Sequence, residues 1–267
     1  VPLSYSKLTS TVRCRDRSVS CLIDSILTDE ALAMGKTIQE ISLPNLAFAF
    51  IPVLVVVVVL YCWSVNGRTA LYAVLRMLIQ LMLIGYVLTF IFESNSALIV
   101  MGVLTVMLGA ASWISLRPVR HQGKSVYLKV LASIALGGVL TLALITQAVL
   151  NVDTWYEPHV VIPLAGMLFS NSMNSVSLAA ERYEAETKQG AAHLKARHVA
   201  LNTAMIPLVN SLFAVGIVAI PGMMTGQILS GVDPLVAARY QVMVMCMVFG
   251  AAGISATCYL ALIKPRG

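Results

Sequence analysis

Seven apolar segments, each long enough to cross a lipid bilayer, occupy most of this chain of 267 residues. A membrane-spanning helix needs about 20 mostly apolar residues. The segments are residues 45–65, 72–92, 96–116, 127–150, 160–180, 201–220 and 240–263. Their apolar residues run without the in-out alternation of a β-barrel strand, so the sequence predicts helices. We therefore expect an all-α, polytopic membrane protein with about seven transmembrane helices.

The composition indicates the same class of protein. Hydrophobic residues make up 58% of the chain and charged residues 11%, which leaves too little polar surface for a water-soluble globule of this length. The formal net charge of +6 reflects membrane topology and does not predict nucleic-acid binding. The lipid bilayer is thus the expected surrounding of the chain.

The basic residues indicate how the helices are oriented, because cytoplasmic connections retain Lys and Arg. Alternate connections hold Arg68, Arg76, Arg117, Arg120, Lys124, Lys129, Arg182, Lys188, Lys195, Arg197, Lys264 and Arg266. The connections between them hold chiefly acidic residues, namely Glu93, Asp153, Glu157 and Asp233. We therefore predict that the N-terminus lies outside and the C-terminus in the cytoplasm.

The first 33 residues do not fit this orientation, because they would bring four basic residues to the outer side, namely Lys7, Arg13, Arg15 and Arg17. The segment has no apolar stretch of signal-peptide length, and translation from Met34 would omit it. It is either not native or a disordered natural extension. In both cases we expect residues 34–267 to form a single transmembrane domain.

The fifth and sixth predicted spans contain polar residues that a lipid-facing helix would avoid. Asn171, Asn174 and Ser175 lie at positions i, i+3 and i+4 and therefore share one helix face. Asn210 lies in the sixth span. Two interpretations remain open for these side chains, which either hydrogen-bond neighbouring helices or line a substrate path.

A second polar pair, Arg76 and Gln80, begins the second span one helical turn apart. A charged side chain at a membrane edge usually extends toward water. The alternative is that the pair belongs to the substrate path.

Residues 221–231 are apolar but interrupted by glycines and too short for a further crossing. They form either a re-entrant segment, which requires protein or a water-filled cavity beside it, or an external loop.

The chain lacks the motifs of a membrane enzyme or an ATPase. Gly123-Lys124-Ser125 matches the end of a phosphate-binding loop, but Pro118 occupies the position of its leading glycine. The predicted spans contain no Asp or Glu, which argues against a proton- or sodium-coupled carrier. We expect a transporter without enzymatic activity or a cofactor of its own, and no residue pattern identifies a metal site.

The segment between the fifth and sixth spans, residues 181–200, is rich in Glu, Lys, Arg and Ala and is expected to be a cytoplasmic, helical docking element. Glu184-Ala185 followed by Gly190 resembles the EAA-x3-G coupling loop with which ABC importer permeases engage their ATPases. Glu186 replaces the second Ala of that motif.

Two basic residues of the same segment, Lys195 and Arg197, have two interpretations. They either contact an acidic surface of a partner or are ordinary solvated residues that mark the cytoplasmic side.

Several motifs from about Met34 onward are similar to those of the FetB-type (YbbM) permease family. They are Ile162-Pro163-Leu164-Ala165-Gly166-Met167 with Asn171 and Met173, Ala204-Met205-Ile206-Pro207 with Asn210-Ser211, Pro221-Gly222-Met223-Met224-Thr225-Gly226-Gln227-Ile228-Leu229-Ser230-Gly231, Asp233-Pro234, Arg239-Tyr240-Gln241, and Arg76 with Gln80. The chain departs from the family before Ala204, where its cytoplasmic segment is shorter and lacks a Leu-Gly-Ala-Thr-like turn.

The resemblance implies an ABC transporter permease of the bacterial inner (plasma) membrane that exports iron or another metal ion, with ATP bound and hydrolysed by a separate ATPase subunit. Plant relatives of that family are linked to aluminium tolerance. Seven spans form a small half of a transporter, so we expect a homodimer of the permease. The alternatives are a channel or secondary carrier without an ATPase, and an assembly or scaffold subunit.

Overall fold

A computed structural model of the chain describes residues 43–63, 67–93, 96–119, 123–152 and 154–263. The helices within these ranges are α2 (Leu43–Phe48), α3 (Phe50–Cys62), α4 (Gly67–Glu93), α5 (Ala97–Ser115), α6 (Lys124–Leu144) with a π-helical extension η1 (Ile145–Val149), α7 (Pro158–Lys188), α8 (His193–Ala214), α9 (Gly222–Leu229) and α10 (Pro234–Leu262). The predictions made for residues 1–33, Arg120, Asp153, Lys264 and Arg266 lie outside the described residues.

Every predicted span coincides with a helix, which confirms the all-α membrane class. Five helical segments in the described ranges are long and apolar enough to cross a membrane, namely Pro44–Cys62, Gly67–Phe92, Ala97–Ser115, Lys124–Val149 and Pro234–Leu262. The other two predicted spans are α7 and α8, whose asparagine, serine and charged residues make them less apolar. The sixth span extends over His193–Ala214 instead of 201–220, and it ends just before Gly216, whose φ of +82° is incompatible with a continuing helix.

The core of the molecule is the bundle of α5, α6, α7, α8 and α10. α6 approaches α10 most closely at Gly137, where an added Cβ would lie 2.2 Å from the Ser255 hydroxyl oxygen and 2.5 Å from the Ala251 carbonyl oxygen. At the next position, a Cβ on Gly138 would lie 2.7 Å from the Phe169 ring of α7. Small residues at such crossings let helix backbones approach each other in a membrane, where packing drives helix association.

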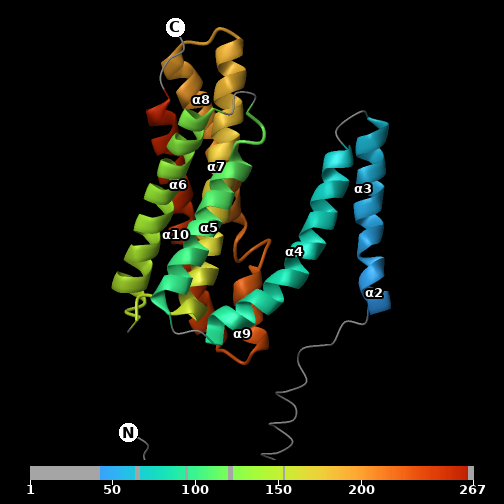
Figure 1. Ribbon diagram of the computed structural model, residues 1–267, viewed down its shortest axis with the longest axis vertical. Coiled ribbons are helices and arrows are strands. Elements are labelled where there is room, and N and C mark those ends of the chain that lie inside the picture. Colours follow the sequence, from blue (N-terminus) through green and yellow to red (C-terminus); the bar gives the residue numbers. More distant parts are fainter. Residues whose placement is uncertain (1–42, 64–66, 94–95, 120–122, 153, 264–267) are drawn as a thin grey trace, which may run out of the picture.

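The hairpin of α3 and α4 stands apart from this bundle. In Figure 1, α3 and the upper part of α4 lie away from the other helices, and α4 leans toward the bundle at its lower end. α3 buries none of its residues. The lower part of α4 borders an apolar cavity of about 680 Å³ shared with α5 and α7, and there the His159 ring of α7 packs on the Phe92 ring with centroids 4.3 Å apart.

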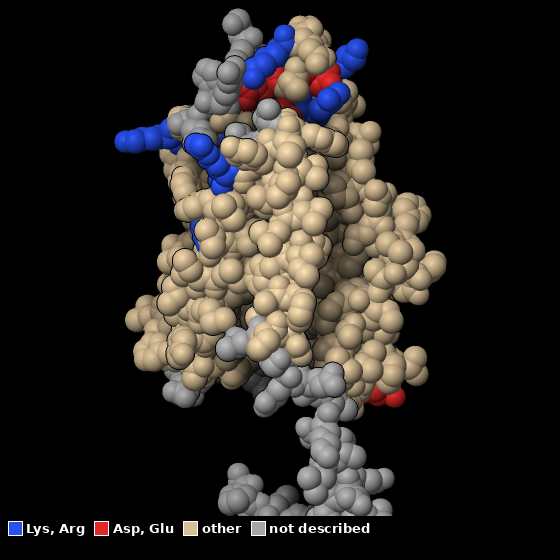
Figure 2. All heavy atoms as spheres, turned by 90° about the vertical axis from the view of Figure 1, so that its right-hand side faces the viewer, with Lys and Arg blue, Asp and Glu red and all other residues tan. Residues whose placement is uncertain are grey.

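The charged residues gather at one end of the molecule. The end of α3, the α5–α6 connection, the α7–α8 turn and the C-terminal end of α10 all lie at that end in Figure 1. Figure 2 shows Lys and Arg side chains concentrated there together with acidic ones, while the sides of the molecule are almost entirely uncharged. The connections that the sequence groups together by their basic residues thus lie on one side, which is the side that the sequence predicts to be cytoplasmic.

Candidate functional site

The polar face of α7 opens onto a groove halfway along the helix. Asn171, Asn174 and Ser175 line this groove together, as their helical spacing predicts. It has a volume of about 380 Å³ and lies between α7, α8 and α10. Asn174 is exposed and Ser175 is buried, so the polar face runs from the molecular surface into the bundle.

The rest of the groove is mainly apolar. Its other lining residues are Met167 and Leu178 of α7, Ala204, Pro207, Leu208, Ser211 and Leu212 of α8, and Val244, Met245, Val248 and Phe249 of α10. The sequence alone did not predict that α10 and Ser211 form part of this site. The spacing of Ala204, Pro207, Leu208 and Ser211 at i, i+3, i+4 and i+7 is the signal that marks this face of α8.

The two asparagines make no hydrogen bond across the groove. Asn171 donates through Nδ2 to the Met167 carbonyl oxygen of its own helix at 2.8 Å, and Asn174 has no hydrogen bond to another described residue. Unpartnered polar groups are costly at membrane depth. The groove is therefore expected to hold water, a polar solute or a polar group of another subunit, which favours a path lining over hydrogen bonding between helices.

Prolines interrupt both helices that carry most of the groove. Pro207 in α8 has no N–H to donate to the Thr203 carbonyl oxygen, and Pro163 in α7 has none for His159. The Thr203 side-chain hydroxyl donates to the Val199 carbonyl oxygen at 2.9 Å, one turn before the proline. A helix that lacks a backbone hydrogen bond bends more easily at that point, so each helix has a point at which one half can tilt relative to the other.

A second cavity adjoins the groove at the end opposite the basic residues. Its volume is about 210 Å³, and Met167 lines both spaces. His159 and Tyr240 also line it, and α9 contributes Met223. Residues 221–231 thus include a short helix that packs beside α10 at this end of the bundle (Figure 1) and does not cross the molecule.

The remaining predicted path residues lie away from the groove. Asn210 is exposed and is not among the lining residues. Arg76 and Gln80 lie on α4, where the Gln80 amide oxygen, in its hydrogen-bonding orientation, accepts from Arg76 Nε at 3.1 Å and Nη2 at 3.3 Å. The pair is therefore satisfied within its own helix, and the structure does not bring it together with the asparagines.

The predicted docking segment, residues 181–200, is helical except for a tight turn. α7 continues to Lys188, residues 189–192 form the turn, and α8 begins at His193. The segment is therefore the meeting point of the two groove helices and not a separate helix. Gly190 of the EAA-like motif lies in the turn with a φ of +82°, Glu184 is buried in the last turns of α7, and Ala185 is half-buried beside it.

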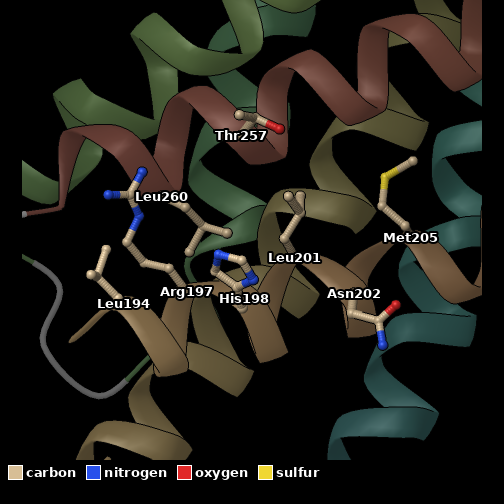
Figure 3. Close-up of a pocket in the computed structure, with 8 residues that line it drawn as sticks. All are labelled: Leu194, Arg197, His198, Leu201, Asn202, Met205, Thr257 and Leu260. Carbon is tan, nitrogen blue, oxygen red and sulfur yellow. The ribbon is translucent and has the colours of Figure 1, made fainter. Parts of the chain in front are cut away.

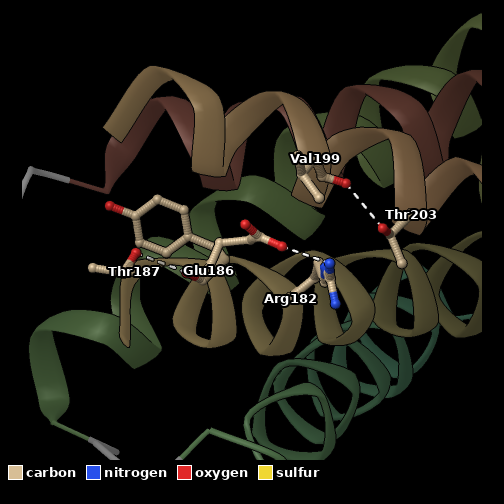
Figure 4. Close-up of polar contacts among 6 residues, drawn as sticks. Arg182, Glu186, Thr187, Val199 and Thr203 are labelled. Atoms are coloured by element: carbon tan, nitrogen blue, oxygen red, sulfur yellow. Dashed lines mark hydrogen bonds and ion pairs between the residues drawn. The ribbon is translucent and has the colours of Figure 1, made fainter. Parts of the chain in front are cut away.

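Polar contacts fix the shape of this turn. Glu184 pairs with Lys188 at 2.8 Å and Arg182 pairs with Glu186, both one helical turn apart. Across the turn, the Tyr183 hydroxyl and His193 Nδ1 share a hydrogen bond of 2.8 Å. Figure 4 shows the Arg182–Glu186 pair on α7 with α8 running alongside. Each ion pair contributes only about 0.2–0.5 kcal/mol to the last turns of α7, and the Tyr183–His193 hydrogen bond joins this end of α7 to the start of α8.

We expect Gly190→Ala to destabilise the α7–α8 turn. An L-residue in the left-handed region costs about 1–2 kcal/mol, and no neighbour within 4 Å of the added Cβ would compensate. The measurement is the thermal unfolding midpoint of the purified protein. Gly123→Ala is the matched control, because Gly123 lies at the same end with a φ of −89° and open space around it. An equal change in both variants would contradict the prediction.

The two basic residues of the segment lie in different surroundings. Lys195 is exposed near the turn. Arg197 lines a separate cavity between α8 and α10. Within the described part of the chain, no group of three or more His, Cys, Asp or Glu residues is placed to hold a metal ion.

Comparison with known proteins places the chain among membrane proteins. The model of an uncharacterised protein family, UPF0014, matches residues 43–266. The membrane protein slr1647 of Synechocystis is 32% identical over 65% of the chain and 73% of its own length. The probable iron export permease protein FetB of Escherichia coli is 32% identical over 74% and 81%, and the protein ALUMINUM SENSITIVE 3 of Arabidopsis thaliana is 33% identical over 78% and 81%. No solved structure matches the chain.

Proposed function

The chain belongs to the UPF0014 family, and on that basis we propose that it is the membrane-spanning permease subunit of an ABC transporter. The proposed cargo is iron or another metal ion, exported across the inner membrane of a bacterium. The name of the FetB relative, a probable iron export permease, supports the cargo and the direction. The energy comes from ATP hydrolysed by a separate subunit.

One observation carries this proposal. The two helices that form the polar groove, α7 and α8, are also the two that meet at the turn on the basic end. A partner that pushes on this turn therefore moves the groove directly. The prolines within both helices provide the points at which such a movement is absorbed.

The groove lining supports an external energy source. It contains amides, hydroxyls, thioethers and hydrocarbon side chains, but no Asp or Glu. A carrier driven by protons or sodium ions usually places ionisable groups or broken-helix sites at the middle of the membrane. In the proposed cycle, ATP-driven closure of two ATPase subunits tilts α7 and α8, and the groove becomes accessible from the outer side through the cavity at Met167.

Two copies of the chain complete the proposed transporter. The groove of one copy reaches the molecular surface at Asn174, so a second copy is needed to enclose it. α4 offers a surface for this contact, because many of its apolar side chains are exposed and the exposed Gln80 lies among them. Its position about 18 Å along the helix from Arg68 is near the middle of a bilayer about 30 Å thick. Asn210 lies outside the groove and is not part of the proposed lining.

The test of the proposal is co-purification with the ABC ATPase encoded nearest to this chain, combined with measurement of cellular iron. We expect an ATPase to co-purify with the wild-type permease, and we expect iron to accumulate in cells without the permease and to fall in cells that overproduce it. Transport without any ATPase would support the channel or secondary carrier instead. Unchanged iron with a shift in another solute would overturn the iron assignment.

We expect Lys195→Glu to weaken the association with the ATPase. Reversing an exposed charge at a docking surface turns an attraction into a repulsion, so the amount of co-purified ATPase should fall by roughly tenfold. Arg68→Glu is the control, because Arg68 begins α4, away from the α7–α8 turn (Figure 1). The same loss in both variants would mean that total charge, and not the turn, governs association.

A further inference from the structure

A cavity at the cytoplasmic end of the molecule is not explained by the proposed transport path. It lies between the first half of α8 and the last turns of α10 and has a volume of about 490 Å³. Figure 3 shows Arg197 reaching toward Leu260 of α10, with His198 beside it on the same face of α8. Leu201 and Met205 continue this face toward the middle of the membrane.

Met205 separates this cavity from the polar groove. A Cβ on Gly253 of α10 would lie 3.5 Å from Met205 Cε and 3.7 Å from its sulfur, so the side chain of Met205 rests against the α10 backbone. Apart from Ala204, which neighbours Met205, the residues of α8 and α10 that line the groove lie on the outer side of this contact. The residues that line the cavity lie at its level or on the cytoplasmic side. The cavity is therefore a site of its own.

The charge of the cavity is not neutralised within the described chain. Its lining contains Arg197 and His198 but no Asp or Glu. The nearby carboxylates of α7 are engaged elsewhere, Glu184 with Lys188 and Glu186 with Arg182, and Arg197 forms no ion pair with a described residue. An Arg guanidinium stays charged at physiological pH and binds phosphate oxygens through several N–H groups.

We propose that this cavity binds an anionic phospholipid of the cytoplasmic leaflet. The phosphate lies at Arg197 and His198, and an acyl chain lies along Leu201 and Met205. Basic pockets between transmembrane helices on the cytoplasmic side suit acidic headgroups. The apolar walls distinguish a lipid from free phosphate, because a soluble anion gains nothing from Leu194, Leu201 and Leu260. A bound lipid would join α8 to α10 just beyond the α7–α8 turn.

The test uses the full chain in nanodiscs of phosphatidylcholine that contain a small fraction of phosphatidylglycerol. Native mass spectrometry after release counts the phosphatidylglycerol retained by each protein. We expect the wild type to retain it, Arg197→Gln to reduce retention about fivefold, as for one basic residue near an anionic surface, and Arg197→Lys to keep most of it. Lys195→Gln is the matched control, because it removes the same charge from the same turn of α8 outside the cavity lining.

Three results would overturn the lipid site. One is equal retention by the wild type and Arg197→Gln, and another is an equal loss in Lys195→Gln, which would indicate a general surface charge. The third is binding of inorganic phosphate, but not of chloride at the same ionic strength, to protein that retains no phosphatidylglycerol, which would indicate a phosphate site without a lipid. If Arg197→Gln does not fold, Leu201→Gln provides the second variant, since a polar group on the acyl wall must also lower retention.

Discussion

Leucine at both positions 171 and 174 is expected to abolish most transport while the protein remains folded. The substitution removes the two amides that face the groove and keeps the side-chain size. Each hydrogen bond to a polar solute is worth about 1 kcal/mol, so losing two reduces transport by roughly tenfold or more. Stability should not fall, because Asn174 has no hydrogen bond to lose and Asn171 bonds only within α7. Iron content of cells expressing each variant measures transport.

Asn210→Leu is the matched control for this experiment. It removes an asparagine amide from a groove helix at a position outside the groove, so transport should remain near the wild-type value. Thermal unfolding of the purified variants separates a transport defect from a folding defect. A double variant that transports normally but unfolds more easily would show that the two asparagines hold helices together and do not line a path.

Leucine at position 137 is expected to prevent α6 and α10 from packing together, and hence the protein from folding into its helix bundle. Even a single added Cβ would lie 2.2 Å from the Ser255 hydroxyl oxygen, 2.5 Å from the Ala251 carbonyl oxygen and 2.9 Å from the Ser255 backbone nitrogen. Two of these three atoms belong to the α10 backbone, so rotating a side chain cannot relieve the overlap. Overpacking costs about 1–3 kcal/mol where side chains can adjust, and we expect a larger loss where α6 and α10 must separate.

The measurement is the amount of monodisperse protein recovered from membranes. Gly85→Leu and Gly102→Leu are the controls, because these glycines lie in α4 and α5 with no atom within 4 Å of an added Cβ. Both controls should accumulate as the wild type does. Normal recovery of Gly137→Leu would mean that α6 and α10 do not pack as closely as the structure has them.

Several features of this fold follow from the sequence alone. Apolar segments of membrane-spanning length identify the helices, because a helix in lipid satisfies its own backbone hydrogen bonds and needs no distant residue to form. The basic connections likewise indicate which helix ends lie together on one side of the membrane, because successive connections between membrane-spanning helices lie on opposite sides. Spacing within one helix also brings Asn171, Asn174 and Ser175 onto one face, as the structure confirms.

The exact ends of the helices, and the residues that come together around the groove, were less predictable from the sequence. The sixth span begins at His193 instead of residue 201, because the helix also includes polar residues that the sequence predicted to lie in the connection. The hydrogen bond between Tyr183 and His193 joins this start of α8 to α7. Asn210 lies outside the groove and Ser211 lies in it. Successive residues of a helix point in directions that differ by about 100°. A small error in the direction in which α8 is assumed to face therefore places Asn210 in the groove instead of Ser211.

The sequence by itself determined that this chain is a helical membrane protein, where its helices lie, and which ends carry the positive charge. Only the tertiary structure decided that α10 forms a wall of the groove, that Arg197 belongs to another cavity, and that α3 and α4 stand apart. The physical reason is that burial in lipid acts on each helix separately, whereas the direction in which a helix faces depends on the shapes of its neighbours. Those shapes meet at contacts such as Gly137 with Ser255, between residues far apart in the chain.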